Sequence, residues 1–380
     1  MPKKIAFIKF GLFSHTNASV SAMLHQHFAE YELEVIDIVE LLGRDEAAQI
    51  LNALQILKYY GRDLLRRRHS FRACHFRTPY MFARIRKRMQ QRLGRNVSSY
   101  VFSFQTQSLY DASVPGLPHF VYTDHTHLSN LYYPGVDRSK LFARAWIDLE
   151  ASLYRNATRV FTMSQHVRHS LLEHYRCDPE RVLCVFAGSN LPGPLIPLQN
   201  DQYRNQRILF AGVDWARKGG PDLIVAFKTV QDRHPNARLI IVGCSPQLEL
   251  RNCDIVGRVP LDQMKNYYSQ ASIFCLPTRL EPFGIVFVES LLNKIPVVGS
   301  NLGAIPEIVE NGKSGYLVEP NNPAELARAL GELLSDPQKC SRFGEHGHRA
   351  VKERYSWDST GKRIRQEIQA AMPETLAMLD

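Results

Sequence analysis

The amino-acid sequence predicts an α/β protein built from two doubly wound domains. Three observations lead to this prediction. Short apolar runs rich in β-branched residues alternate with helix-length segments from end to end, the alternation forms two successive series, and a stretch rich in Pro and Gly separates them. Strands separated by helix-length segments pair in parallel sheets through right-handed crossovers. At 380 residues, the chain is long enough for two domains of ordinary size.

Apolar runs in both halves of the chain are expected to be strands. Those of the first domain are Ile5–Ile8, Leu33–Ile38, Tyr100–Phe104, His119–Tyr122, Arg159–Met163 and Val182–Phe186. Those of the second domain are Ile208–Ala211, Leu239–Val242, Asp254–Val256, Ile273–Leu276, Val297–Gly299 and Tyr316–Val318. The segments between them are expected to form the crossover helices.

The join between the domains is visible in the composition. The stretch 188–197 is rich in Pro and Gly, and the polar run 199–206 follows it. The first domain is therefore expected to span 1–190 and the second 206–356, with a ligand-binding cleft between them. The last segment, 357–380, has a helical pattern that leaves its partner open, and one option is that it packs back on the first domain.

The composition is typical of a soluble globular protein, with 44% hydrophobic and 22% charged residues. No apolar run reaches the roughly 18 residues of a membrane-spanning helix, and the apolar run at the N-terminus ends too soon for a secretion signal. The seven cysteines include no C-x-x-C pair, which indicates reduced thiols with neither disulfides nor a zinc site. A cytoplasmic protein is expected.

Two glutamates, Glu281 and Glu289, are separated by seven residues that predict a turn and an apolar helix. Pro282 and Gly284 form the turn, and the residues after it are typical of a buried helix. A charged side chain in such a helix needs a partner, while the amides of Gly284 and Ile285 at its start favour an anion. Two carboxylates beside an anion site fit a sugar nucleotide. A capping glutamate plus a buried glutamate paired with an arginine is the alternative.

Glycine-containing loops follow several strands of the second domain. Arg217–Gly220 follows the first strand, and glycines let the backbone approach a phosphate that adjacent cations neutralise. An ordinary turn with two solvated cations is the alternative. Val256–Arg258 and the turn at Gly303 follow two other strands. Together with the turn at Gly284, these loops fall on the edge where open α/β sheets bind ligands.

Together these residues resemble the retaining glycosyltransferase family 4, which has the GT-B fold of two Rossmann-like doubly wound domains facing each other across a cleft. The resemblance is strong over 208–356, where the glutamate pair, the Arg217–Gly219 loop and the Gly303 turn stand in family order and spacing. It is weaker over the first domain. It implies a nucleoside-diphosphate sugar as co-substrate, no other cofactor and no required metal. The sequence has no D-x-D placed to hold a metal.

The resemblance also implies a donor-binding set. Its members are Gly11, Arg217, Lys218, Val256, Gly257, Arg258, Glu281, Phe283, Gly284, Ile285 and Glu289. Glu281 is expected at the hydroxyls of the donor sugar and Glu289 at those of the ribose. The cations Arg217 and Lys218 are expected at the diphosphate together with the helix amides, and Val256–Arg258 is expected to flank the base.

Two positions depart from the family pattern. Gly212-Val213 stands where many members have Gly-Arg, so one phosphate contact is missing or Arg217 takes its place. The first glycine loop, at Gly11, has one glycine where many relatives have two. Its approach to the donor is therefore less certain than that of the loops in the second domain.

A histidine-rich loop follows a strand of the first domain. In similar transferases a histidine at this position reaches the donor sugar and the reaction centre, and His125 is the better match, with Asp124 and His127 as neighbours. A metal site is the alternative for the His-x-His pattern, but no third ligand is identifiable. The catalytic residues are expected to be His125, Lys218 and Glu281, with no metal.

The net charge of +10 is concentrated in one segment. Between Lys58 and Arg95 there are thirteen Lys and Arg residues against one acid. Within it, Pro79–Arg95 has the pattern of a basic amphipathic helix, which fits an interface with anionic lipid. A core-packed helix with a solvated basic face is the alternative. Because no recognition motif accompanies the charge, no nucleic-acid partner is expected.

The function expected is transfer of a sugar from a UDP- or GDP-sugar to an acceptor hydroxyl with retention of the anomeric configuration. The acceptor is unknown, and a membrane-associated glycolipid or a polysaccharide precursor is one candidate. The alternatives are a sugar-nucleotide epimerase or another GT-B enzyme, and a non-catalytic protein that binds anionic lipid through 79–95. The expected location is the cytoplasm, with peripheral attachment to the inner face of the membrane as an option.

Overall fold

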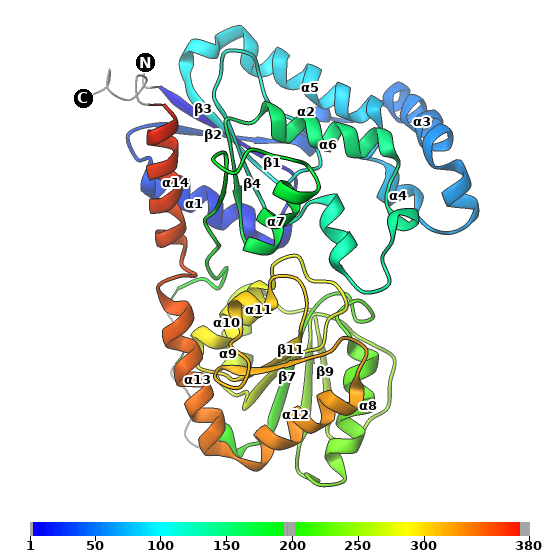
Figure 1. Ribbon diagram of the computed structural model, residues 1–380, viewed down its shortest axis with the longest axis vertical. Helices are drawn as coiled ribbons and strands as arrows, with labels where there is room; N and C mark the ends of the chain where they lie inside the picture. The colour runs from blue at the N-terminus through cyan, green and yellow to red at the C-terminus, as the bar shows by residue number, and fades with distance from the viewer. Residues whose placement is uncertain (1–2, 194–195, 197–201, 373–380) are drawn as a thin grey trace. The chain divides into compact units, whose positions relative to one another are not determined.

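The structure, a computed structural model, describes residues 3–193, 196 and 202–372 (Figure 1). The chain divides into two compact units, of which the first contains Met1–Phe186 and Thr360–Asp380 and the second contains Ala187–Ser359. Parts of the predicted linker, 194–195 and 197–201, and the end of the predicted terminal helix, 373–380, lie outside the described residues.

The first unit contains a six-stranded parallel sheet in the order β2-β1-β3-β4-β5-β6, flanked by helices (Figure 1). Its strands are β1 (Lys4–Lys9), β2 (Glu32–Asp37), β3 (Tyr100–Thr106), β4 (His119–Thr123), β5 (Arg159–Thr162) and β6 (Val182–Cys184). Its helices before the join are α1 (Thr16–His27), α2 (Ile38–Leu42), α3 (Glu46–Leu65), α4 (Phe71–Cys74), α5 (Pro79–Leu93), α6 (Arg144–Asn156) and α7 (Gln165–Glu173).

The second unit contains another six-stranded parallel sheet, in the order β12-β11-β10-β7-β8-β9. Its strands are β7 (Arg207–Ala211), β8 (Arg238–Val242), β9 (Cys253–Gly257), β10 (Ile273–Leu276), β11 (Val297–Ser300) and β12 (Gly315–Val318). Its helices are α8 (Gly220–Gln231), α9 (Met264–Tyr268), α10 (Ile285–Leu292), α11 (Ile305–Ile308), α12 (Pro323–Ser335) and α13 (Pro337–Lys352). Every predicted strand is present, and the predicted pair of doubly wound α/β sheets is confirmed.

Short 3-10 turns join some of these elements. They are η1 (Phe13–His15), η2 (Gly94–Ser99), η3 (His127–Tyr132), η4 (Arg138–Lys140), η5 (Gln202–Arg204) and η6 (Leu261–Gln263). Among the described residues, no helix is both long enough and apolar enough to span a membrane.

The first strand of each sheet lies in its interior and marks a topological switch point. In the first unit β1 pairs with both β2 and β3, and in the second unit β7 pairs with both β8 and β10. Interior parallel strands are covered on both faces, which explains why Ile5–Ile8 is at most 1% exposed along its whole length. Ligands of open α/β sheets bind at the carboxyl ends of the strands beside such a switch point.

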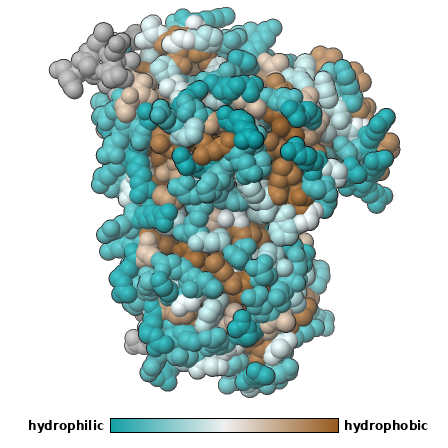
Figure 2. All heavy atoms as spheres, viewed as in Figure 1, coloured by the Kyte–Doolittle hydropathy of each residue, from teal (hydrophilic) through white to brown (hydrophobic). Residues whose placement is uncertain are grey.

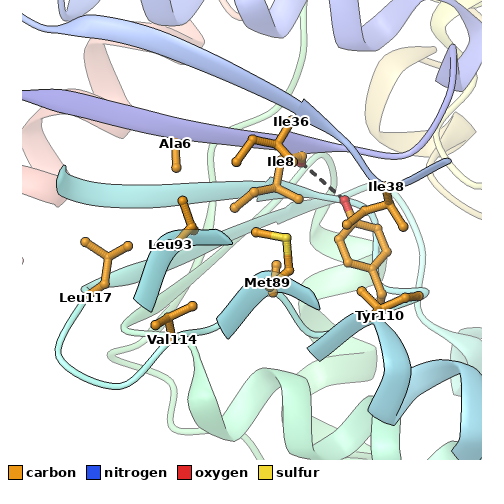
Figure 3. Close-up of a cluster of buried hydrophobic side chains, with 11 residues drawn as sticks. Ala6, Ile8, Ile36, Ile38, Met89, Leu93, Tyr110, Val114 and Leu117 are labelled. Atoms are coloured by element: carbon orange, nitrogen blue, oxygen red, sulfur yellow. Dashed lines mark hydrogen bonds between the residues drawn. The ribbon is translucent and has the colours of Figure 1, made fainter. Parts of the chain in front are cut away.

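The apolar face of α5 belongs to the core of the first unit. Most of the surface in view is hydrophilic (Figure 2), whereas Met89 and Leu93 of α5 point toward Ile8 and Ile36 of the sheet (Figure 3). The apolar residues of this helix are each at most 5% exposed: Met81, Phe82, Ile85, Met89 and Leu93. The prediction that this apolar face meets lipid is therefore wrong, and the core-packed alternative is correct.

The helix α14 (Trp357–Ala371) crosses the division between the units, and most of it belongs to the first. Its Thr360 hydroxyl donates to the carbonyl of Val185 at 3.2 Å, and Ile364 and Ile368 are fully buried. Arg365 pairs with Glu30 at 2.7 Å. The first unit is thus completed by a segment more than 170 residues downstream of its last strand, at β6.

Candidate active site

Two loops meet at the switch point of the second unit. One follows β7 and leads into α8, and the other follows β10 and leads into α10. They are tied together by the amide of Arg279, which donates to the carbonyl of Arg217 at 2.8 Å, and by the Arg217 guanidinium, which donates to the carbonyl of Leu280 at 2.8 Å. The approach needs a glycine, because a Cβ atom on Gly219 would lie 1.8 Å from the carbonyl oxygen of Pro277.

This junction brings Lys218 and Glu281 together. The Lys218 ammonium forms an ion pair with the Glu281 carboxylate, and the two side chains are only 11% and 8% exposed. A pair this enclosed interacts far more strongly than a surface ion pair, because little water screens it. The structure therefore places a cation beside a carboxylate that can accept hydrogen bonds from hydroxyl groups.

Two helices start beside this pair, each after a glycine in the left-handed region. Gly219 has φ +77° before α8 and Gly284 has φ +91° before α10, and neither helix start has a side-chain cap. The first amides of a helix lack intrahelical partners and carry a partial positive charge. At the start of α10 these amides form a natural site for a phosphate. At the start of α8 the amide of Gly220 donates to the carbonyl of Trp215 at 2.9 Å and Pro221 has no amide hydrogen. Phe283, just before α10, is buried with its ring 6.1 Å from that of Tyr355.

Glu289 lies deeper, in the second turn of α10, and has different partners. It is 3% exposed, accepts from the Tyr268 hydroxyl at 3.1 Å and from the amide of Asn190 at 3.3 Å. Burial raises its pKa to about 7 because the charged form loses its hydration. Glu281 and Glu289 therefore share one helix and its preceding turn but hold separate hydrogen-bond partners.

The other predicted loops lie at the same edge of this sheet. Gly257 (φ +76°) ends the edge strand β9, and its carbonyl accepts from the amide of Gly243 at 2.7 Å. A Cβ atom on Gly243 would lie 2.7 Å from the carbonyl oxygen of Gly212, so the ends of β7, β8 and β9 approach through glycines. Val256 and Arg258 are exposed beside this contact. Gly303 (φ +58°) follows β11 and precedes α11.

Gly11 occupies the matching position at the switch point of the first unit. It follows β1 with φ +56°, and its carbonyl accepts from the Asn17 amide group at 2.8 Å. Asn17 in turn accepts from the Thr106 hydroxyl at 2.8 Å, which fixes the loop to the end of β3. The backbone amide of Gly11 lies 3.3 Å from the carboxylate of Asp37 and donates to it.

His125 follows β4 in the first unit and is held at both ring nitrogens. Nδ1 lies 3.0 Å from the Ser129 hydroxyl, which itself donates to the Thr126 carbonyl at 2.7 Å, so Nδ1 carries the proton. Nε2 accepts from the Asn130 amide group at 3.1 Å. Burial lowers the pKa of His125 to about 4, with nearby His166 acting in the same direction. The ring is therefore neutral at physiological pH.

His127 faces the interior of the first unit. Its Nε2 accepts from the amide of Phe142 at 2.9 Å, and its ring packs edge-on against Trp146 at 5.1 Å. Burial and, to a lesser extent, the positive charge of Arg77 lower the pKa of His127 to about 3. Both histidines thus use an imidazole lone pair for a hydrogen bond, and no group of three potential metal ligands occurs among the described residues.

A cavity of about 340 Å³ adjoins His125 in the first unit. Its wall includes the Arg77 guanidinium, which lies 4.5 Å from the ring centre of Phe142, and the carboxyl of Glu150. Glu150 is fully buried and accepts from the Ser108 hydroxyl at 3.0 Å. Burial raises the pKa of Glu150 to about 7, although hydroxyl and amide donors lower it. The cavity therefore combines an aromatic wall with a cation and a titratable carboxyl group.

The structure brings together Lys218, Glu281 and the backbone of Arg217, and it places Gly284 beside them. His125 and Gly11 lie in the other unit, and Glu289 lies with Tyr268 and Asn190. The sequence analysis did not predict Tyr268, Asn190 or Gly243 as residues of the site. A glycine directly after a strand was an available signal for Gly243. Nothing in the sequence separates Tyr268 from its neighbour Tyr267 as the partner of a buried carboxylate.

A family model provides the first comparison. The model of the glycosyl transferases group 1 matches residues 199–350, which covers β7 to α13 and every predicted donor-binding residue except Gly11. The match lies in the second unit and covers less than half of the chain. The Lys218–Glu281 pair and the uncapped start of α10 lie within the matched residues.

Two curated relatives match overlapping lengths of the chain. A GDP-mannose-dependent phosphatidylinositol monomannoside mannosyltransferase of Mycobacterium tuberculosis is 30% identical over 166 residues, covering 39% of this chain and 43% of the relative. A D-inositol 3-phosphate glycosyltransferase of Streptomyces scabiei is 27% identical over 252 residues, covering 59% and 56%. The chain thus spans about half the length of the curated relatives it matches.

Solved structures share the fold over nearly the whole chain. The sucrose-phosphate synthase of Thermosynechococcus elongatus has a TM-score of 0.71 at 16% identity and covers 98% of this chain and 99% of that one. The HepE protein of Anabaena, solved with UDP-glucose, has a TM-score of 0.64 at 16% identity and covers 97% and 99%. At these identities the likeness concerns the fold of the two units, which is the predicted Rossmann-like one.

Proposed function

We propose that this protein is a glycosyltransferase that moves a sugar from a nucleoside-diphosphate sugar to an acceptor hydroxyl with retention of the anomeric configuration. The observation that carries the proposal is the enclosed Lys218–Glu281 pair beside the uncapped start of α10. A cation and free amides suit a diphosphate, and a carboxylate suits sugar hydroxyls. The match of residues 199–350 to the model of the group 1 glycosyl transferases supports the same chemistry.

In the proposed reaction these groups stabilise the charge that develops on the substrate. As the bond between the sugar and the phosphate breaks, the sugar gains oxocarbenium character and the diphosphate gains negative charge. Lys218 and the amides at the start of α10 stabilise the departing diphosphate, and losing one such donor typically costs a factor of about 10²–10³ in rate. Because protein groups supply the positive charge, transfer proceeds without a divalent metal, so turnover should survive excess EDTA.

Retention follows in this proposal if the acceptor attacks from the face that the diphosphate leaves. No side-chain nucleophile is then required, and Glu281 serves to bind sugar hydroxyls. The test is the NMR spectrum of the first product formed, whose anomeric proton should show the same configuration as the donor. An inverted product would remove this part of the proposal.

The acceptor is assigned to the first unit, where His125 borders the 340 Å³ cavity. The His125 ring is neutral and hydrogen-bonded at both nitrogens, so it borders the cavity as an uncharged ring and not as a cation. The guanidinium of Arg77, which lies over the ring of Phe142, gives the cavity wall N–H donors for the hydroxyls of an acceptor.

The decisive experiment is calorimetric titration of the protein with UDP, GDP and ADP, and with the matching monophosphates. One diphosphate should bind much more tightly than the matching monophosphate. A ligand at 100 times its Kd should raise the free energy of unfolding by about 2.7 kcal/mol. Lys218→Met should abolish the preference for the diphosphate. Lys228→Met, which removes an exposed lysine from α8, is the matched control and should bind like the wild type.

Two outcomes would contradict the proposal. If no nucleoside diphosphate binds, the second unit has no donor site and the proposed transfer is excluded. If the diphosphate binds but the sugar nucleotide is isomerised in the absence of any acceptor, the protein is an epimerase built on the same fold.

A further inference from the structure

The helix α3 carries two apolar faces, and only one of them packs into the first unit. The inward face is formed by Ala48, Asn52, Ile56 and Tyr60, which are at most 6% exposed. The outward face is formed by Ile50, Leu51, Leu54 and Leu57, which are 64%, 49%, 59% and 57% exposed. At about 100° per residue, the two sets lie on opposite sides of the helix.

The exposed face continues beyond the helix. Leu65, at the end of α3, is 86% exposed, and Phe71, at the start of α4, is 47% exposed. Figure 2 shows apolar atoms among hydrophilic ones on the margin of the first unit where Figure 1 draws α3 and α4. Scattered apolar residues are normal on a surface, whereas four apolar side chains on one face of one helix, each about half exposed or more, indicate an interaction site.

Cations border this row. Between residues 46 and 72 the chain has six Lys and Arg residues and two acids, which gives a net charge of +4. The cations are Lys58, Arg62, Arg66, Arg67, Arg68 and Arg72. Of these, Arg68 lies 3.6 Å from Asp63 and donates to the carbonyl of Ser139 at 3.3 Å. The rest of the set is exposed and borders the apolar residues in sequence.

We infer that this α3–α4 surface, defined by the exposed apolar residues and the six cations, docks the protein on an anionic lipid bilayer. A helix lying in the membrane interface buries an apolar face at the acyl boundary while its basic flanks meet anionic head groups. Both features are present here, because the exposed apolar residues and the cations belong to one continuous segment of the chain, 46–72. The inference rests on the exposed residues of α3 and α4 and is independent of the proposed sugar transfer.

Charge decides between a lipid surface and other occupants. A second copy of the chain docking through the same patch would bring a net charge of +4 against +4, and juxtaposed like charges are repulsive. A nucleic acid would meet the cations but leave the exposed leucines without a partner. An anionic bilayer is the partner that satisfies both the apolar row and the basic border.

The neighbouring helix α5 offers an internal control. Its apolar face is buried, and two of its cations are paired within the unit, Arg84 with Asp45 at 2.7 Å and Arg92 with Glu34 at 2.8 Å. Lys87 and Arg88 remain on its exposed side. If binding were only electrostatic attraction to any basic patch, α5 would contribute as much as the α3–α4 surface does.

The first test is sedimentation of the full chain with two kinds of vesicle. One is made of phosphatidylcholine alone, and the other contains about 30% of the anionic lipid phosphatidylglycerol. The wild type should bind the anionic vesicles and lose that binding as salt is raised. Leu54→Gln/Leu57→Gln should reduce the partition constant by a factor on the order of 100, because each buried leucine contributes about tenfold or more. Val225→Gln, at an apolar position of α8 that is 55% exposed, should change nothing.

The second test separates the two basic helices. Arg62→Gln/Arg66→Gln should lower the partition constant about 30-fold, since each cation near an anionic surface contributes about fivefold. Lys87→Gln/Arg88→Gln removes the same charge from α5 and should lower it by much less. Because all four side chains are exposed, these variants are expected to fold, and urea unfolding followed by the fluorescence of Trp146 in the first unit serves as the check.

Four results would overturn the inference. The wild type could fail to bind anionic vesicles, the leucine variant could bind as tightly as the wild type, or the α5 variant could lose as much binding as the α3 variant. A concentration-dependent dimer that Leu54→Gln/Leu57→Gln dissociates would also overturn it, since a second copy would then cover the face. Loss of vesicle binding with nucleotide binding intact leaves the proposed function standing.

Discussion

The Lys218–Glu281 pair illustrates why a site residue is also a structural residue. Removing one partner of an enclosed ion pair leaves the other charge without compensation, which typically costs about 3–5 kcal/mol. A single substitution therefore changes both the stability of the protein and its binding of the ligand, and the two effects have to be separated. Substituting both partners by neutral side chains of similar size removes the charges together and is often close to neutral for stability.

We therefore expect Lys218→Met to destabilise the second unit by about 3 kcal/mol and Lys218→Met/Glu281→Gln to recover most of that loss. Transfer should remain down by about 10²–10³ in both variants. Urea unfolding and turnover, measured side by side, check this. Arg238→Met is the control, because Arg238 and Asp254 form a 2.7 Å pair with side chains 51% and 44% exposed, and its loss should cost no more than about 1 kcal/mol. Recovered turnover in the double variant would make the pair purely structural.

His125 shows how hydrogen bonds select a protonation state. Its Nε2 accepts from Asn130, and burial keeps the pKa near 4. We expect the ring to stay neutral, with the proton on Nδ1, at pH 6 in an NMR titration of the imidazole nitrogens. Asn130→Asp replaces a donor by a carboxylate and should raise the pKa of His125 above 6 and protonate Nε2. A wild-type ring that is protonated at pH 6 would contradict this account.

At the scale of elements, glycines determine how closely the strand-end loops approach. Gly219 combines a positive φ with a contact that no side chain could make, and Gly331 in the middle of α12 has open space around its Cβ position. Gly219→Ala should destabilise the second unit by about 3 kcal/mol or more. Gly331→Ala should stabilise it by about 0.5–1 kcal/mol. Urea unfolding of both variants checks this, and equal stability of the two would show that the loops adjust.

The helices α3 and α5 mark where sequence patterns stop being informative. Both have apolar and basic residues at helical spacing, and the pattern of α5 indicated either a core helix or a lipid-binding helix. The sheet decides, because α5 packs on it with its single apolar face. The helix α3 has apolar residues on two opposite faces, so one of them stays exposed whichever face packs inward.

At the scale of the whole molecule, buried histidines dominate the acid response of the first unit and a buried glutamate that of the second. In the first unit burial lowers the pKa of His119, His125 and His166 to about 4. In the second unit burial raises the pKa of Glu289 to about 7. The unfolded histidines bind protons below about 6.5, so their contribution to stability is lost as the pH falls from 6.5 toward 4. The folded Glu289 keeps its proton up to about pH 7, so its contribution to stability is lost as the pH rises from 4.5 to 7.

We therefore expect acidification from pH 6.5 to pH 5 to destabilise the first unit and to stabilise the second. Glu150 opposes the histidines in the first unit, because its pKa is also raised to about 7, but it is one group against several. Urea unfolding followed by the fluorescence of Trp146 in the first unit and of Trp215 in the second, each in a variant lacking the other tryptophans, checks this. Parallel shifts of the two units would contradict it. Glu289→Gln should remove the pH dependence of the second unit.

The sequence by itself determined both sheets, because parallel strands covered on two faces are apolar throughout and stand out between helix-length segments. It also determined which loops of the second unit lie at the ligand-binding edge, since strand direction fixes that edge once the strands are known. Only the tertiary structure decided the partners of each side chain: Lys218 for Glu281, Tyr268 for Glu289, and the core for the apolar face of α5. These pairings join residues distant in the chain, and their choice depends on how closely backbones approach, which a local pattern of residues does not encode.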